Sequence, residues 1–132
     1  MRKIWLIAGL IVGAWLLAAC SRERPDIAVE TAQHDFGMIQ QGAVATTEIA
    51  IHNNGQGDLK IESLTTSCGC TVAQVEPSTI PPGGEGRLSI SYDSGYHPDR
   101  GAIKRYIFIV SNDPDEQEFR VIIQADVQEP TS

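Results

Sequence analysis

The sequence predicts an all-β protein, an antiparallel β-sandwich of seven to eight strands. Beyond residue 25, apolar residues recur with a period of two, the turns are rich in Gly, Asn and Pro, and no stretch has the 3.6-residue period of a helix. Many short strands without helices are typical of two packed sheets. In chain order, the predicted strands are 27–30, 35–39, 45–52, 58–65, 71–76, 86–92, 103–110 and 118–127.

Turn residues set the boundaries of these strands. HNNGQGD, between 45–52 and 58–65, consists of residues that tolerate positive φ. In PSTIPPGGEG, between 71–76 and 86–92, the prolines restrict the backbone angle φ, and the glycines that follow allow φ values that other residues rarely adopt. SNDPDEQ, between 103–110 and 118–127, offers side-chain oxygens for an Asx-turn before a proline.

Alternation within the strands predicts which side chains face the core. In the last strand the odd-numbered residues from Phe119 to Val127 are apolar, whereas Arg120, Gln124 and Asp126 lie on the other side. The strands 45–52 and 86–92 show the same alternation, with these residues on the apolar side: Ile49, Ile51, Leu88, Ile90 and Tyr92. The run YIFIV at 106–110 is apolar on both faces, which predicts a central strand covered on both sides.

The N-terminus has the pattern of an export signal, predicted to form a signal-peptide helix over residues 1–19. Arg2 and Lys3 precede an uncharged, largely apolar run at 4–17, which is shorter than the roughly 20 residues of a membrane-spanning helix. The second interpretation is that this apolar run stays in the mature protein as a single-pass membrane anchor.

The sequence LAAC at 17–20 resembles the lipobox of bacterial lipoproteins. The resemblance implies that Cys20 becomes the lipid-modified first residue of the mature chain, carrying acyl chains such as palmitate. An ordinary signal peptide that ends near a cysteine is the other interpretation. Ser21 is not the aspartate that retains enterobacterial lipoproteins at the inner membrane, so an envelope protein facing the periplasm is expected, with the outer membrane favoured. Residues 20–25 would be the lipidated cysteine and a short tether, 26–128 the folded domain and 129–132 a tail.

Charge excludes some classes of partner. Without residues 1–19, eight Lys and Arg face 17 Asp and Glu, a net charge of about −9. An acidic surface argues against nucleic acid, because Lys and Arg contacts to phosphate supply most of that affinity. It also argues against direct adsorption on anionic lipid, so the acyl chains would make the membrane contact.

The order of several motifs resembles the bacterial DUF1573 family, a domain of unknown function. The motifs are HDFGMIQQG, IHNNGQGDLKIESLTTSCGCTV, IPPGGEGRLSISYD, GAIKRYIFIVSNDP and VIIQADV, and the resemblance covers roughly residues 27–127. Its most specific element is Ser-Cys-Gly-Cys-Thr at 67–71. The resemblance implies an immunoglobulin-like module of the major-sperm-protein and cilia-associated type, often exported or lipid-anchored. It indicates a fold more than a function.

No catalytic constellation is evident, and the chain is predicted not to be an enzyme. The three histidines, His34, His52 and His97, stand apart in the sequence without a nucleophile-elbow, phosphate-loop or paired-histidine metal motif. No small-molecule substrate is identified. The loop GYHPDRG at 95–101 is a candidate binding loop, because Tyr96 and Arg100 are residue types common in binding hot spots. The alternative is a packed connection in which Tyr96 covers an edge.

Cys68 and Cys70 are the remaining candidates for chemistry. In an extended strand their Cα atoms would lie about 6.6 Å apart, so a disulfide requires Gly69 to bend the backbone. A three-residue loop gains only about 1.6 kcal/mol from closure, which makes the bridge a poor staple. The pair is therefore interpreted as a strand corner or simple disulfide, as a labile redox pair, or as a Cu(I) site by analogy with a tethered copper chaperone. Zinc would need two further ligands.

Two functions follow from these observations. The first is a lipid-anchored, non-catalytic, immunoglobulin-like module that binds an unidentified protein or other envelope partner. The alternative is a protein that handles redox equivalents or Cu(I) at Cys68 and Cys70; no other cofactor is expected.

Overall fold

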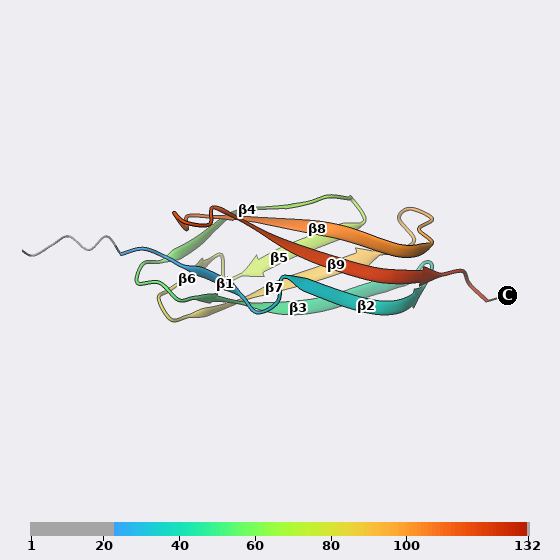
Figure 1. Ribbon diagram of the computed structural model, residues 1–132, viewed down its shortest axis with the longest axis horizontal. Helices are drawn as coiled ribbons and strands as arrows, with labels where there is room; N and C mark the ends of the chain where they lie inside the picture. The colour runs from blue at the N-terminus through green and yellow to red at the C-terminus, as the bar shows by residue number, and fades with distance from the viewer. Residues whose placement is uncertain (1–22, 132) are drawn as a thin grey trace, which may run out of the picture.

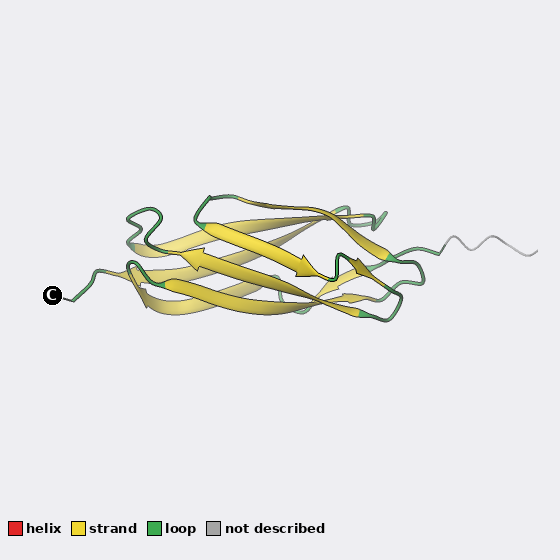
Figure 2. Ribbon diagram, turned by 180° about the vertical axis from the view of Figure 1, so that it is seen from behind, coloured by secondary structure: helices red, strands yellow, loops and turns green. Residues whose placement is uncertain are grey.

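The computed structural model describes residues 23–131, which form two β-sheets packed face to face (Figures 1 and 2). Cys20 and the predicted signal segment lie outside these residues. The nine strands are β1 (Ile27–Val29), β2 (Gln33–Gln40), β3 (Val44–Asn53), β4 (Leu59–Thr66), β5 (Thr71–Glu76), β6 (Thr79–Ile80), β7 (Glu85–Asp93), β8 (Gly101–Ser111) and β9 (Glu118–Gln128). No helix within residues 23–131 is long and apolar enough to cross a membrane.

One sheet has four strands in the order β1-β3-β7-β5, and the other has five in the order β2-β9-β8-β4-β6. The predicted all-β sandwich is confirmed, and each predicted strand agrees with an observed one to within two residues. The two-residue β6 was not predicted, because PSTIPP is too short and too rich in proline to show a period. It pairs with Leu59 and Lys60 at the start of β4.

One strand pair departs from the antiparallel prediction. The N-terminal segment pairs antiparallel with β3 as β1, then changes sheet and pairs parallel with β9 as β2. The change of sheet lets a single segment contribute to both sheets on one side of the sandwich. Sequence alternation cannot reveal such a pairing, because it reports only which face of a strand is buried.

The core lies between the sheets and is made of the alternating residues that the sequence indicates. Its members with at most 2% exposure include Ile49, Ile51, Leu59, Ile80, Leu88, Ile90, Tyr92, Ile107, Ile109, Val121, Ile123 and Val127. The outer face of β8 differs from the prediction. Among the described residues no second layer covers it, and the ring of Tyr106 instead stacks on Phe108 at 6.4 Å beneath the Arg120 guanidinium.

Two buried polar side chains close the end of the sandwich where the described chain begins. Asn53 is fully buried, and its amide nitrogen donates to the carbonyls of Gly57 and Ile80. Its amide oxygen accepts from the N–H groups of Asp26 and Gly55, so all four hydrogen-bonding positions of the amide are used. This one side chain therefore joins β3, the following turn, β6 and the N-terminal segment.

Asp113, from the SNDP turn, closes the same end. Its carboxylate accepts from the N–H groups of Ile27, Asp115 and Glu116 at 2.9, 2.8 and 3.2 Å. Burial acts to raise the pKa of Asp113, but the three N–H donors, helped by the charge of Arg24, hold that pKa below its ordinary value of 3.8.

We predict that Asp113→Asn lowers the free energy of unfolding by about 1–3 kcal/mol at pH 7, because one buried N–H group loses its acceptor. A depressed pKa means that the contribution of the carboxylate is complete above pH 3.8 and declines as the pH falls through the lower folded-state value. Denaturant unfolding at several pH values should therefore show the difference between the two proteins narrowing below pH 3.8. The control is Asp115→Asn, at an exposed ion pair with Arg24, where a change under about 1 kcal/mol is expected. An equal loss at pH 3 and pH 7 would contradict the charge assignment.

Candidate functional site

The Cys68–Gly69–Cys70 segment forms a tight turn between β4 and β5. Cys68 and Cys70 are joined by a disulfide, and their Cα atoms lie 5.1 Å apart, closer than an extended strand would place them. The Thr71 N–H donates to the Cys68 carbonyl at 3.1 Å, and the Thr66 hydroxyl donates to the same carbonyl at 2.9 Å. The backbone thus bends at Gly69. A disulfide between Cys68 and Cys70 is expected to require this bend.

The two sulfur atoms have different surroundings. Cys70 is buried at 2% exposure, whereas Cys68 is half-buried beside the exposed Gly69. Cys68 Sγ accepts the Cys70 N–H at 3.1 Å. Cys70 Sγ accepts Nε–H of Arg105 at 3.3 Å, so among residues 23–131 the buried sulfur is the one with a cationic donor.

Arg105 reaches this sulfur from the opposite sheet. On β8 it follows Ile103 and precedes Ile107 on the face that points into the sandwich. Its guanidinium donates to Asp99 Oδ2 at 2.7 Å and to the Lys104 carbonyl at 2.9 Å. Because an unpaired charge on the core face would be costly, these contacts fix the guanidinium next to Cys70.

Asp99 also accepts the hydroxyl of Tyr92 at 2.7 Å. Burial raises the pKa of Tyr92, and the hydrogen bond to Asp99 and its negative charge raise it further, while Arg105 opposes them. The phenol therefore remains a protonated donor to Asp99 near neutral pH. Tyr92 lies on β7 and Arg105 on β8, so Asp99 connects the two sheets.

Of the two candidate residues in the binding loop, Tyr96 lies at the disulfide turn and Arg100 does not. A Cβ atom on Gly69 would lie 2.8 Å from the Tyr96 hydroxyl oxygen, which shows that the Tyr96 ring covers the turn. Tyr96 is nevertheless 58% exposed. Arg100 forms an ion pair with Glu129 on the segment after β9.

The disulfide turn lies at the end of the sandwich opposite the beginning of the described chain (Figure 1). Backbone hydrogen bonds gather the turns at this end: Asp93 N–H to Cys70, Ser94 N–H to Ala43, and Gln41 N–H to Gln128. We call the group of Cys68, Cys70, Tyr92, Tyr96, Asp99 and Arg105 the disulfide end.

Sequence reasoning missed Arg105, Asp99 and Tyr92 as members of this site. The signal for Arg105 was present, because the alternation of Ile103, Ile107 and Ile109 places residue 105 on the same inward face. A charge in that position requires a partner. Neither alternation nor spacing indicates which partner the fold supplies.

The metal interpretation of Cys68 and Cys70 stays a prediction. Within residues 23–131 no group of three or more His, Cys, Asp or Glu side chains could hold a metal ion. With the sulfurs joined to each other, Cu(I) binding would require prior reduction. The Arg105 guanidinium beside Cys70 would then oppose a second cation electrostatically.

The histidines occupy separate parts of the described chain. His34 lies on β2 against Phe36, His52 lies on β3 with Nδ1 3.6 Å from Glu85, and His97 packs on Tyr96. None of these contacts places a histidine beside a serine or cysteine nucleophile, the arrangement that acyl transfer requires.

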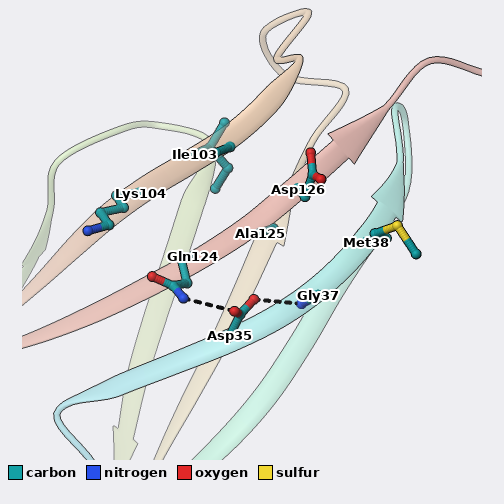
Figure 3. A pocket seen from close by; sticks show the side chains of 9 residues that line it. Asp35, Gly37, Met38, Ile103, Lys104, Gln124, Ala125 and Asp126 are labelled. Carbon is teal, nitrogen blue, oxygen red and sulfur yellow. Dashed lines mark hydrogen bonds between the residues drawn. The ribbon is translucent and has the colours of Figure 1, made fainter.

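A separate hollow of about 520 Å³ lies on the outer face of the five-stranded sheet, between β2 and β8 (Figure 3). It forms where the pairing of β2 with β9 is interrupted between Asp35 and Met38. Asp35 accepts from the Gln124 amide and from the Gly37 N–H, each at 2.8 Å, and these bonds lower its pKa. This carboxylate is therefore ionised and already engaged, which makes it poorly suited to act as a general base.

The comparisons with known proteins agree on the fold. A family model described as "Protein of unknown function (DUF1573)" matches residues 27–127. A protein of unknown function from Porphyromonas gingivalis W83 superposes with a TM-score of 0.73 at 26% identity, over 83% of this chain and 50% of that one. This chain thus spans about half of that protein. A search of curated proteins finds no match.

Two more distant structures have the same sandwich. The ASH/PapD-like domain 7 of human CEP192 has a TM-score of 0.62 at 12% identity, over 80% of this chain and 87% of that one. The periplasmic chaperone SfaE has a TM-score of 0.54 at 13% identity, over 78% of this chain and 57% of that one. At such identities the likeness concerns the fold alone, and it supports the immunoglobulin-like architecture.

We predict that Gly69→Ala displaces the Tyr96 ring and changes stability by under about 0.5 kcal/mol, because the new methyl group meets only the end of an exposed side chain. The ring-proton chemical shifts of Tyr96 measure the displacement, and thermal unfolding measures the stability. In a Tyr96→Ala background the same substitution should leave the thermal transition unaltered. Unchanged Tyr96 shifts in Gly69→Ala would show that the ring does not cover the turn.

Proposed function

Because the chain belongs to the DUF1573 family, whose function is unknown, we propose from its own geometry that it is a non-catalytic binding module of the bacterial envelope. It is lipid-anchored through Cys20, faces the periplasm, and holds an extended segment of a partner protein along the free edge of β5. The observation that carries this proposal is the row of unpaired backbone groups on that edge.

β5 is an edge strand whose outer backbone groups are free. The Asp93 N–H donates to the Cys70 carbonyl, so backbone groups of every second residue from Cys70 onward point to β7. The groups of Thr71, Ala73 and Val75 point the other way. Those of Thr71 bond to Cys68 and Thr66, whereas the N–H and C=O groups of Ala73 and Val75 bond to no other described residue.

Two of the other strand edges, those of β2 and β4, are interrupted. β2 has a register shift between Asp35 and Met38, with Gly37 at φ 70°, and β4 has one between Ile61 and Ser63. Bulges of this kind bend an edge and hinder pairing with a further strand. β5 instead pairs with β7 in one unbroken register from Thr71 to Glu76. Its outer edge is therefore suited to accept an added strand.

The outer face beside β5 offers a place for the side chains of such a segment. A shallow groove of about 490 Å³ runs over the small residues Ser89 and Ser91 of β7, between β3 and the Val72 and Gln74 side chains of β5. Val72 is 65% exposed. In strand addition the main chain supplies affinity and such depressions select side chains. Without residues 1–19 the chain has a net charge of about −9, which favours a neutral or basic partner segment.

The lipid anchor is supported by the lipobox-like sequence LAAC at 17–20, and the direction of the sandwich agrees with it. The described chain starts at one end of the long axis, and the disulfide end lies at the other (Figure 1). A short tether at the starting end would hold this end near the membrane and direct the disulfide end away from it. Attachment to the outer membrane is favoured because Ser21, not aspartate, follows the lipidated position.

We predict that Cys20→Ser abolishes acylation and leaves an uncleaved or mislocalised precursor, because the lipid would be attached to this sulfur. Metabolic labelling with an alkyne fatty acid, electrophoretic mobility and membrane fractionation measure the outcome. The double variant Cys68→Ser/Cys70→Ser should label like the wild type. Normal labelling of Cys20→Ser would refute the assignment.

The edge-strand proposal predicts that Ala73→Pro prevents partner binding. Proline removes an outward N–H and leaves the ladder to β7 intact, and an edge strand tolerates it. With a photoreactive residue at position 72 of the full chain in cells, the wild type should give a discrete cross-linked protein, and Ala73→Pro should reduce it at least about tenfold.

Val44→Pro is the matched control for this experiment. Glu30 N–H donates to the Ala50 carbonyl, so Val44 also presents an outward N–H, at the opposite side of the same sheet and outside the groove. Its cross-linked product should equal that of the wild type. Equal loss in both proline variants, or no product in the wild type, would refute binding at β5.

A further inference from the structure

We infer that the Cys68–Cys70 disulfide undergoes thiol–disulfide exchange, in which an incoming thiolate attacks Cys68 and Cys70 leaves as a thiolate stabilised by Arg105. This activity goes beyond the proposed binding of an extended segment and does not depend on it. Its substrate class is a dithiol on a protein, and the probes below stand in for that dithiol.

Access selects the sulfur that is attacked. Exchange requires the nucleophile, the attacked sulfur and the leaving sulfur to lie nearly in line, so the attacked sulfur must be reachable from solvent. Cys70 is 2% exposed and lies in the core cluster, whereas Cys68 is half-buried at the surface. Cys68 is therefore the sulfur that a thiolate can approach.

Charge selects the same direction. The leaving sulfur acquires a negative charge, and the Arg105 Nε–H lies 3.3 Å from Cys70 Sγ to receive it. The corresponding donor to Cys68 Sγ is the neutral N–H of Cys70 at 3.1 Å. A hydrogen bond from a cation stabilises a thiolate more than one from a neutral amide, so negative charge is favoured on Cys70.

Asp99 is a positioning residue for this step. Its Oδ2 accepts from Arg105 at 2.7 Å and from the Tyr92 hydroxyl at 2.7 Å, which orients the guanidinium with Nε–H toward Cys70. Arg105 and Asp99 side chains are only 20% and 15% exposed, so water screens their effect on the sulfur weakly. Asp99 therefore holds the guanidinium in place, and the Nε–H is the group that faces Cys70 Sγ.

The exchange balances in two steps. First, the thiolate of a dithiol bonds to Cys68 Sγ, the Cys68–Cys70 bond breaks, and the electron pair remains on Cys70 as a thiolate. Second, the other thiol of the dithiol loses its proton and attacks its own sulfur in the mixed disulfide, releasing Cys68 as a thiolate that takes up a proton. The dithiol is oxidised to a disulfide by two electrons, and the cysteine pair is reduced by the same two electrons. The reverse sequence oxidises the pair.

The first test maps the attacked sulfur in the full-length wild-type chain. The protein is mixed with reduced glutathione, quenched in acid after increasing times, alkylated and analysed by peptide mass spectrometry. Glutathione should appear on Cys68 in at least about ten times the amount found on Cys70. Glutathione mainly on Cys70, equal amounts on both, or a bridge that excess dithiothreitol leaves intact in the folded protein would overturn the inference.

The second test measures the equilibrium of the pair against graded ratios of reduced to oxidised dithiothreitol. Arg105→Gln should shift the equilibrium toward the disulfide by about tenfold, since the leaving thiolate loses its cationic partner. Arg105→Lys should recover part of the shift. The matched control is Arg87→Gln, which removes an exposed arginine paired with Glu48 on the outer face and should behave as wild type.

Together, the mapping of the attacked sulfur and the equilibrium measurement decide whether the inference holds. Mapping needs no substitution, so it judges the inference even where Arg105→Gln does not fold. An unchanged equilibrium in folded Arg105→Gln, or an equal shift in Arg87→Gln, would overturn the role of Arg105. The binding proposal and this inference can be told apart with Ala73→Pro. If this variant loses the cross-linked product but exchanges thiols normally, or keeps the product but loses exchange, the two activities are independent.

Discussion

The arrangement of the disulfide end depends on a single charge that points into the sandwich. Arg105 occupies an inward position of β8, between isoleucines whose side chains form the core. A guanidinium there must be neutralised and hydrogen-bonded, and the fold meets this requirement with Asp99, the Lys104 carbonyl and Cys70 Sγ. Two of these partners lie outside β8, so satisfying the charge also fixes the loop after β7 and the turn before β5. The Tyr92 hydroxyl completes the group through Asp99.

The two ends of the sandwich solve different physical problems. At the end where the described chain begins, the Asn53 amide and the Asp113 carboxylate satisfy backbone groups that the strands leave open. The hydrogen-bonding positions of these two side chains are occupied by backbone groups, which leaves little capacity to bind a ligand. At the disulfide end the polar groups converge instead on a sulfur atom, beside a half-buried second sulfur and an exposed tyrosine. The first end is built for stability, and we place the proposed chemistry at the second.

Much of the fold could be predicted from the sequence, because alternation in an antiparallel sheet directly reports burial. The inward positions of β7 and β9, and the turns that end them, follow from residue type alone. The parallel pairing of β2 with β9 could not be found this way, since register between distant strands leaves no local pattern. The site divides similarly. Cys68, Cys70 and Tyr96 are visible as unusual residues, whereas the contact of Arg105 with Cys70 joins positions 35 residues apart on two sheets. Only the assembled sandwich brings them together.

The bridge stabilises the fold only weakly, so exchange at its two sulfur atoms costs the fold little stability. A loop of three residues gains only about 1.6 kcal/mol from closure, so the fold has little dependence on the bond. The turn has other supports, since Thr66 and Thr71 hold the Cys68 carbonyl and the Asp93 N–H holds that of Cys70. These hydrogen bonds are made by backbone and hydroxyl groups and not by the sulfur atoms, so we expect β4 and β5 to keep their registers when the bridge opens. The free edge proposed for binding begins at Ala73, three residues after Cys70, so a segment paired there would end near the turn that holds Cys68, the sulfur that an incoming thiolate attacks.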